Sequence, residues 1–326
     1  MLGHYSNILC VLSQINESSA VAAQALHVAN SHQARLTFQL ALESLPPNAS
    51  LVMASFAYIE SHKSIADEAT QRLEEMVASL SPQQPVGTKV TIGRPYYDVI
   101  QQVINGGYDL VITQAQSGMT SFVYGADAMH LIRKCPCPVW LVQQQTARNY
   151  SSVLATVDVN YHFTAEENAV RKQLNEDVLA SAAEVALLEN AQLHIVHVYQ
   201  PPAEHMIRDG LMPVNQQLMD SALEEIKHER QQQLELLVST LAQRFDDKSL
   251  AYLKPQVHLL TGYPASAIAR AAEQLNADVV VMGTVARVGI PGLLMGNTAE
   301  DILNNLDCAV LALKPGGFKT IIPPHN

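Results

Sequence analysis

Short apolar runs recur along the chain and alternate with longer stretches of helical composition. Residues 7–13 form the first such run, an alanine-rich stretch follows, and a second apolar run lies near residues 36–40. Continuous apolar runs of this length are typical of strands buried on both faces of a parallel sheet. Strands that alternate with helices predict a parallel sheet with right-handed crossovers and helices on both faces.

The whole pattern occurs twice. The segments that match between the two halves are 7–13 with 152–158, 93–113 with 262–282, and 137–142 with 308–313. The second pair aligns without a gap, and it places Asp109 of the first half opposite Asp278 of the second. An internal repeat of this length indicates two related domains.

We therefore predict an α/β fold with two tandem doubly wound domains, each with a five-stranded parallel sheet. The first domain is expected at residues 1–145 and the second at 150–315, with the polar stretch 143–151 as the boundary and a tail at 316–326. The expected strands lie near 8–12, 36–40, 89–92, 110–113 and 139–142, and near 153–157, 193–198, 256–260, 279–282 and 310–313. The last strand of each half is apolar, and an exposed strand edge is a liability, so we expect the two domains to pair through these strands.

Composition narrows the possible partners. The chain of 326 residues has 31 acidic and 20 basic residues, with a formal net charge of −11. Proteins that bind nucleic acid need clustered Lys and Arg, so nucleic acid is a poor partner unless a local basic patch exists. We expect no signal peptide and no membrane insertion, because the chain shows neither a basic segment before an apolar run nor about 18 consecutive apolar residues. A cytoplasmic location follows from these expectations.

The four cysteines give little sign of a metal site. They are Cys10, Cys135, Cys137 and Cys308. The C-x-C spacing of the middle pair is unlike the usual zinc pair, and no second pair exists. Cys10 lies in an expected strand. We interpret Cys135 and Cys137 as small buried residues at the entrance of a strand in a reducing compartment and predict no metal.

The strongest candidate for a ligand site follows the fourth strand of the second half. Gly283 begins a glycine-rich loop that contains Arg287, and Gly296, Asn297 and Thr298 open the next helix. Ligands of open parallel sheets bind beyond the carboxyl ends of the strands. Glycines allow the backbone to approach phosphate oxygens, and the free amides of a helix start attract negative charge. The Thr298 hydroxyl and the Arg287 guanidinium would add polar contacts.

This loop resembles that of universal stress proteins of the ATP-binding kind, which carry Gly, two residues, Gly, nine residues, then Gly and Ser or Thr. Gly283 and Gly296 occupy the first and third glycine positions at that spacing. Ala286 replaces the second glycine, and Asn297 stands at the Ser or Thr position, directly before Thr298. The resemblance covers nearly the whole chain. It implies adenine nucleotide alpha hydrolase-like domains and, as ligand, ATP or another phosphate-bearing nucleotide-like molecule.

The resemblance also implies an acidic residue after the first strand that contacts the nucleoside. Asp158 holds this position in the second domain, and the nucleoside end would reach toward Val198 at the end of the second strand. In the first domain Ser13 replaces the carboxylate, and the loop at 114–125 lacks the first glycine and is two residues shorter. The site of the first domain is therefore expected to be degenerate.

No catalytic residue is predicted. The chain has neither a GxxxxGK[ST] phosphate loop nor a G-x-S-x-G nucleophile turn. His162 lies near Asp158 in the sequence, and we interpret it as a solvated loop residue. His194 and His197 are three positions apart in an expected strand, so they point to opposite faces and do not form a simple metal pair.

Residues 202–247 form an extended helical stretch whose apolar face contains several methionines. The apolar residues of this face are Met206, Leu211, Met212, Leu218 and Met219. One interpretation is packing against the sheet or the other domain. The other is a flexible cover over a ligand cavity, because Met adapts to irregular surfaces.

The favoured hypothesis is a cytoplasmic stress-response protein that binds a nucleotide or nucleotide-like phosphate ligand in the second domain. A scaffold or interaction protein that binds no nucleotide is the main alternative, because the Ala286 methyl group could obstruct a phosphate. A slow ATPase is a third. The expected partners are a small phosphate-bearing molecule and, within the chain, the other domain, while a homo-oligomer is also compatible with the repeat.

Overall fold

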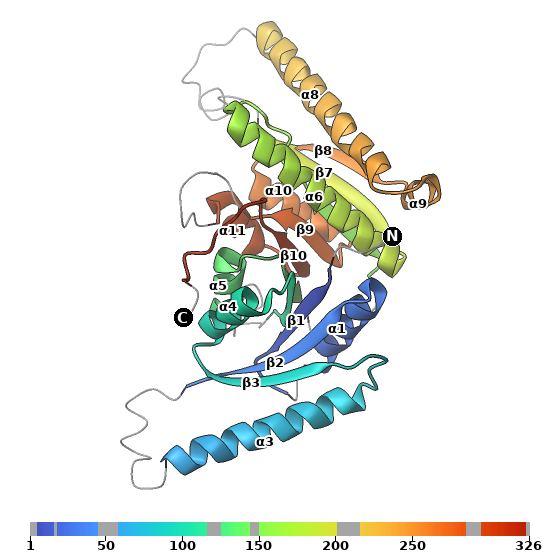
Figure 1. Ribbon diagram of the computed structural model, residues 1–326. Helices are drawn as coiled ribbons and strands as arrows, with labels where there is room; N and C mark the ends of the chain where they lie inside the picture. The colour runs from blue at the N-terminus through green and yellow to red at the C-terminus, as the bar shows by residue number, and fades with distance from the viewer. Residues whose placement is uncertain are drawn as a thin grey trace. The chain divides into compact units, whose positions relative to one another are not determined.

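The computed structural model of the chain describes residues 5–15, 18–44, 58–115, 125–143, 150–200, 216–284 and 295–323. The chain divides into two compact units. The first unit comprises Met1–Arg148, Ala309–Ala312 and Lys319–Asn326, and the second comprises Asn149–Cys308 and Leu313–Phe318. Strands alternate with helices in both (Figure 1), which confirms the predicted α/β class. Most of the boundary predicted at 143–151 lies outside the described residues, so the domain limits stay a prediction.

The first unit contains a five-stranded parallel sheet in the order β3-β2-β1-β4-β5. Its strands are β1 (Asn7–Leu12), β2 (Arg35–Glu43), β3 (Gly87–Gly93), β4 (Leu110–Gln114) and β5 (Val139–Val142). Every residue of β1, β4 and β5 is buried, which explains why their sequences are largely apolar. Residues Ala309–Ala312 of β10 (Ala309–Leu313) also belong to this unit, where β10 runs antiparallel to β5. The pairing of the two halves stays a prediction.

Helices cover the sheet of the first unit. They are α1 (Ser19–His32), α3 (Tyr58–Ser79), α4 (Pro95–Gly106) and α5 (Ala126–Lys134). Helix α1 packs on β1 and β2, α3 lies along β3, and α4 contacts both β3 and α5 (Figure 1). Gly107 ends α4 in a left-handed conformation with φ 62°, a geometry that Gly adopts without a steric penalty.

The second unit contains four parallel strands in the order β9-β6-β7-β8. These are β6 (Ser152–Thr156), β7 (Gln192–Tyr199), β8 (Gln256–Thr261) and β9 (Val279–Gly283). Its helices are α6 (Ala165–Glu189), α8 (Gln216–Ser239), the 3₁₀ helix η1 (Thr240–Gln243), α9 (Asp247–Leu253), α10 (Pro264–Gln274) and α11 (Asn297–Leu303). Helix α6 packs with α8 and α9, whereas α10 packs with α11.

The expected strands are confirmed as elements. Each overlaps an observed strand, and their ends differ by at most three residues. The largest difference is at β2, which continues to Glu43 because its last residues pair with the end of β3. The fifth strand predicted for the second half is β10, most of which groups with the first unit.

The repeat is also visible in the hydrogen bonds at the amino ends of the sheets. Asp278 precedes β9, and its carboxylate accepts from the amides of Ser151 and Ser152 at 2.6 and 3.0 Å. Asp109 precedes β4 and accepts in the same way from the two amides at the start of β1, at 2.7 and 3.0 Å. Each carboxylate therefore fixes the first strand of its unit against the fourth.

Replacing Asp278 by Ala should lower the free energy of unfolding by about 1–3 kcal/mol, because the amides at the start of β6 lose their charged acceptor. Urea denaturation measures this change. Glu273→Ala, which removes an exposed carboxylate at the end of α10, is the matched control and should change stability much less. Equal effects of the two substitutions would contradict this role of Asp278.

Candidate functional site

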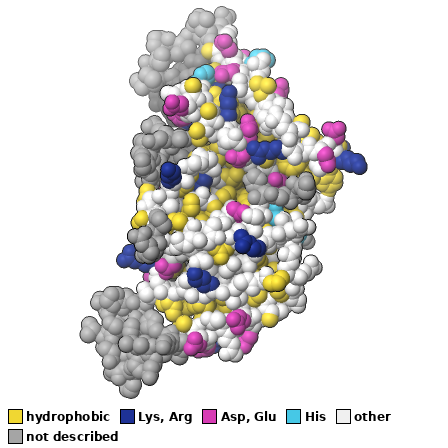
Figure 2. Space-filling view, viewed as in Figure 1, with side chains coloured by type: hydrophobic (Ala, Val, Ile, Leu, Met, Phe, Trp, Pro, Cys, Tyr) yellow, Lys and Arg dark blue, Asp and Glu magenta, His cyan; other side chains and the backbone are white. Residues whose placement is uncertain are grey.

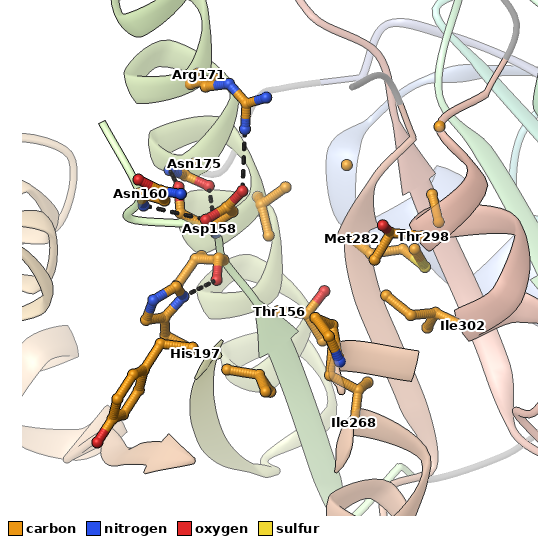
Figure 3. A pocket seen from close by; sticks show the side chains of 18 of the residues that line it. Thr156, Asp158, Asn160, Arg171, Asn175, His197, Ile268, Met282, Thr298 and Ile302 are labelled. Carbon is orange, nitrogen blue, oxygen red and sulfur yellow. Dashed lines mark hydrogen bonds and ion pairs between the residues drawn. The ribbon is translucent and has the colours of Figure 1, made fainter. Parts of the chain in front are cut away.

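A cavity of about 650 Å³ lies within the second unit, at the carboxyl ends of β6, β7 and β9 (Figure 3). This is where ligands bind in open parallel sheets, and the volume lies in the range of small-molecule sites. Its apolar lining includes Leu174, Val178, Ile268, Met282 and Ile302. Polar groups gather mainly at the end formed by the loop after β6, so the cavity combines an apolar floor with a polar end.

Most of the residues predicted to bind a ligand lie around this one cavity. Its lining includes Asp158, Val198, Gly283, Gly296 and Thr298. Asn297, the first residue of α11, is exposed and is not part of the lining, and Arg287 lies outside the described residues. The structure thus brings five of the predicted residues together, while their role in binding stays a prediction.

The backbone of Asp158 is held by Asn175, a buried residue of α6. The amide of Asp158 donates to Asn175 Oδ1 at 3.1 Å, and Asn175 Nδ2 donates to the carbonyl of Asp158 at 2.8 Å. Asn175 Nδ2 also donates to the hydroxyl of Tyr161 at 3.0 Å. One amide side chain thereby satisfies both backbone groups of Asp158, which fixes where its carboxylate points.

The carboxylate of Asp158 is paired with Arg171, one helical turn before Asn175. Arg171 donates to Asp158 Oδ2 at 2.9 Å and to Glu167 Oε1 at 3.0 Å, while the amide of Asn160 donates to Asp158 Oδ1 at 3.0 Å. The guanidinium also lies over the ring of Phe163, 4.0 Å from its centroid. The side chain of Asp158 is 57% exposed, so this ion pair contributes little to stability, and its main effect is to orient the carboxylate.

Gly283, at the end of β9, has a packing reason to be glycine. A Cβ atom added there would lie 2.7 Å from Leu174 Cδ2, so any side chain would force Leu174 of α6 to move. The sequence motif assigned this glycine to phosphate approach. The structure shows that it also lets α6 lie close to the sheet beside the cavity.

His197 lies on β7 and also lines the cavity. Its Nδ1 lies 3.0 Å from the carbonyl of Val157, and its buried Nε2 has no hydrogen-bond partner among the described residues. Burial lowers the pKa of His197, against the opposing effect of Asp158. A neutral ring with Nδ1 as the donor agrees with this environment.

His194 points to the other face of β7, as predicted. Its Nδ1 lies 3.1 Å from Nε2 of His258 on β8. Burial lowers the pKa of both rings, and His258 adds to the effect on His194. His162, in contrast, is exposed and pairs with Glu229 at 3.2 Å.

Helix α8 contributes Ile226 and Arg230 to the cavity. The buried guanidinium of Arg230 donates to Asn160 Oδ1 at 3.3 Å, which ties α8 to the loop after β6. In the stretch expected to pack or to cover a cavity, Met206, Leu211 and Met212 lie outside the described residues, and the side chains of Leu218 and Met219 are not described. The described part of this stretch, which includes α8, does border the cavity.

The remaining features raised by the sequence are the cysteines, metal-binding clusters, membrane-spanning helices and basic patches. All four cysteines are buried, as predicted for Cys135 and Cys137, whose sulfurs lie 3.5 Å apart. Among the described residues, no cluster of three or more His, Cys, Asp and Glu is arranged to hold a metal ion. No helix in the described part of the chain combines the length and apolar character needed to cross a membrane. On the face shown in Figure 2, Lys and Arg side chains lie singly among acidic and neutral ones.

Comparison with known proteins identifies the family. The model of the universal stress protein family matches residues 4–143 and again residues 169–314. This chain belongs to the universal stress protein family. The two matched segments correspond to the two halves of the repeat.

Individual relatives of this universal stress protein agree with the family match. Universal stress protein E of Escherichia coli K12 is 32% identical over 240 residues, which cover 72% of this chain and 70% of that protein. Universal stress protein E of Photorhabdus laumondii is 26% identical over 327 residues, with 98% of each chain covered.

Solved structures show the same fold at low identity. A universal stress protein from Archaeoglobus fulgidus DSM 4304 superposes with a TM-score of 0.59 at 14% identity, covering 95% of this chain and 98% of its own. A protein of unknown function from Pseudomonas aeruginosa PAO1 gives a TM-score of 0.63 at 23% identity, covering 96% and 94%. Both extend the likeness over both halves of the universal stress protein.

Sequence reasoning missed Arg171, Asn175, His197 and Arg230 as cavity residues. A signal existed for Asn175, since it interrupts the otherwise apolar stripe of the helix after the first strand. His197 similarly interrupts the apolar sequence of β7. The cavity-facing position of Arg230 depends on how α8 packs, which no local pattern specifies.

The lowered pKa of His197 makes a prediction about pH. The folded state binds the proton less readily than the unfolded chain, whose histidine titrates near the ordinary pKa of 6.5. This contribution to stability is therefore present above that pH and is lost as the pH falls, by up to about 1.4 kcal/mol per pH unit for one group. His194 and His258 act in the same direction.

His197→Gln keeps a neutral donor for the Val157 carbonyl but cannot titrate. Between about pH 8 and about pH 5, the free energy of unfolding should decrease less in this variant than in the wild type. The difference is the part that protonation of His197 on unfolding contributes. Urea denaturation across this range measures the slope, and the values near pH 8 report the packing cost of the substitution alone. Identical slopes would show that His197 is not protonated on unfolding.

Proposed function

We propose that this universal stress protein is a cytoplasmic stress-response protein that binds a nucleotide or nucleotide-like phosphate ligand in the cavity of the second unit. The main support is that an oriented carboxylate, Asp158, and the glycine-rich motif residues Gly283 and Gly296 border the same cavity. A cavity of about 650 Å³ is large enough for such a molecule.

The phosphates would lie near Gly283, Gly296 and Thr298, with Arg287 and Asn297 nearby in the sequence. The first-turn amides of a helix have no acceptor within the helix, so those of Asn297 and Thr298 would serve as donors, whereas the amide of Gly296 already donates to the carbonyl of Thr284. Thr298 adds a hydroxyl at the cavity wall. Negative charge would thus be placed where backbone donors gather.

The nucleoside would lie toward Asp158 and Val198. Among the described residues, Asp158 Oδ1 and Oδ2 each accept one hydrogen bond. A carboxylate can accept about four, so capacity remains for the hydroxyls of a sugar. The apolar side chains of Val198 and Ile268 would contact the flat face of a base.

Two alternatives remain from the sequence. An interaction protein that binds no nucleotide would leave the cavity without a ligand after purification. A slow ATPase needs a positioned base or a metal ion. Asp158 is paired with Arg171, and Nε2 of His197, the nitrogen left to act as a base, is buried, which favours binding over hydrolysis. Metal-dependent turnover that is lost on changing Asp158 would support the ATPase instead.

Native mass spectrometry of freshly purified full-length protein tests the proposal. We expect a bound molecule that contains phosphate, and its release and fragmentation would identify it. Titration calorimetry with that molecule, or with ATP as the probe, then gives the affinity. Absence of any retained molecule, together with no heat on adding ATP, AMP or other nucleotides, would favour the interaction protein.

Substitutions should place the ligand in the second half. Arg287→Ala should weaken binding by ~1–3 kcal/mol, as for the loss of a charge-assisted hydrogen bond, and Gly296→Val should obstruct the phosphates. Gly125→Val, at the matching position of the first half, is the control and should leave the affinity intact when the fold is intact by circular dichroism. Unchanged affinity in both second-half variants would show that the ligand binds elsewhere.

A further inference from the structure

A buried lysine lies next to the cavity, directly after β10. Lys314 is only 9% exposed, and its Nζ donates to Oγ1 of Thr284 at 2.9 Å. The ammonium also lies 5.0 Å from the ring centroid of Phe318. Burying an ammonium group has a substantial desolvation cost, so a lysine at this position calls for a reason beyond filling space.

Thr284 connects Lys314 to the cavity wall. It follows β9, is fully buried, and lines the cavity together with Gly296. Its amide and its hydroxyl both donate to the carbonyl of Leu313, at 3.1 and 3.0 Å. Its carbonyl accepts from the amide of Gly296 at 3.1 Å. Thr284 therefore joins the end of β9, the end of β10 and the residue that precedes α11.

The first half provides a natural comparison for this cluster. By the repeat, Ala115 corresponds to Thr284, and Gln143 corresponds to Lys314. The amide of Ala115 donates to the carbonyl of Val142 at 2.9 Å, as the amide of Thr284 does to Leu313. The backbone joint is thus present in both halves, but the hydroxyl and the ammonium occur only in the second. The backbone joint forms without them in the first half, and in the second half they add a side-chain tie to it.

We infer that Lys314 is a positioning residue for the phosphate end of the cavity. Through Thr284 it fixes the end of β9 relative to Gly296, and its charge makes this end of the cavity more favourable for an anion. The inference rests on the proposed function, and it adds a residue that does not itself line the cavity. It also explains why the two halves share a backbone but differ in these two side chains.

One arm of the test needs no ligand. Amide hydrogen exchange of the full chain is compared between the wild type, Lys314→Gln and Lys314→Arg. Lys314→Gln reproduces the side chain of the first half, and it should accelerate exchange at Thr284 and Gly296 by about tenfold, the effect of losing one charge-assisted hydrogen bond. Amides of β6 should be unaffected. Lys314→Arg keeps the charge and should exchange at nearly the wild-type rate.

The other arm compares ligands with and without phosphate. Calorimetry with ATP and with adenosine as probes should show that Lys314→Gln binds ATP about tenfold more weakly, while adenosine is bound as by the wild type. Thr284→Ala should behave like Lys314→Gln, and Thr284→Ser, which keeps the hydroxyl, should bind ATP normally. Thermal unfolding checks that each variant is folded.

The outcomes separate the inference from the function on which it rests. An unchanged affinity for ATP in Lys314→Gln, or an equal loss for ATP and adenosine, would overturn the inference, because a purely structural lysine does not distinguish phosphate. Exchange at Thr284 and Gly296 that is the same in all three proteins would overturn it as well. A wild-type protein that binds neither probe would contradict the proposed function for adenine nucleotides, and the exchange rates alone would then decide whether Lys314 positions these residues.

Discussion

The candidate site depends on one constraint, which is the order of the parallel strands. In the second unit the chain proceeds outward from β6 to β7 and β8, and then returns to β9 on the other side of β6. Right-handed crossovers place the outward and returning helices on opposite faces of the sheet. The chain therefore leaves the ends of β6 and β9 toward opposite faces of the sheet, and the cavity lies at these ends. Asp158 follows β6, and Gly296 directly precedes the helix that comes after β9.

The same constraint acts in the first unit, where the first four strands have the same order, yet the chemistry at the carboxyl ends differs. Ser13 stands where the second half has Asp158. Ala115 replaces Thr284 and Gln143 replaces Lys314, so the first half has neither the hydroxyl nor the ammonium group. Under the proposed function, the side chains at the strand ends, rather than the backbone alone, decide whether an anion is favoured there.

Sequence patterns predicted the fold well because strands buried on both faces are mostly apolar, and because the repeat shows each strand type twice. The site was predictable only where a local motif exists, as for Asp158 and Gly283. Arg171 and Asn175 reach the cavity because of how α6 packs on the sheet, where Leu174 lies close to Gly283. Such tertiary placement leaves no fixed spacing in the sequence.

The carboxylates Asp109 and Asp278 have kept the same role at the amino edges of the two sheets, whereas the carboxyl edges have diverged. This is the signature expected after duplication of a single ancestral domain. The aspartate contacts that hold the strands lie at one edge and the proposed ligand site at the other, so one copy could drift at its carboxyl edge without endangering its scaffold. The first half is therefore a natural starting point for acquiring a new specificity, by design or by selection, at little risk to the rest of the chain.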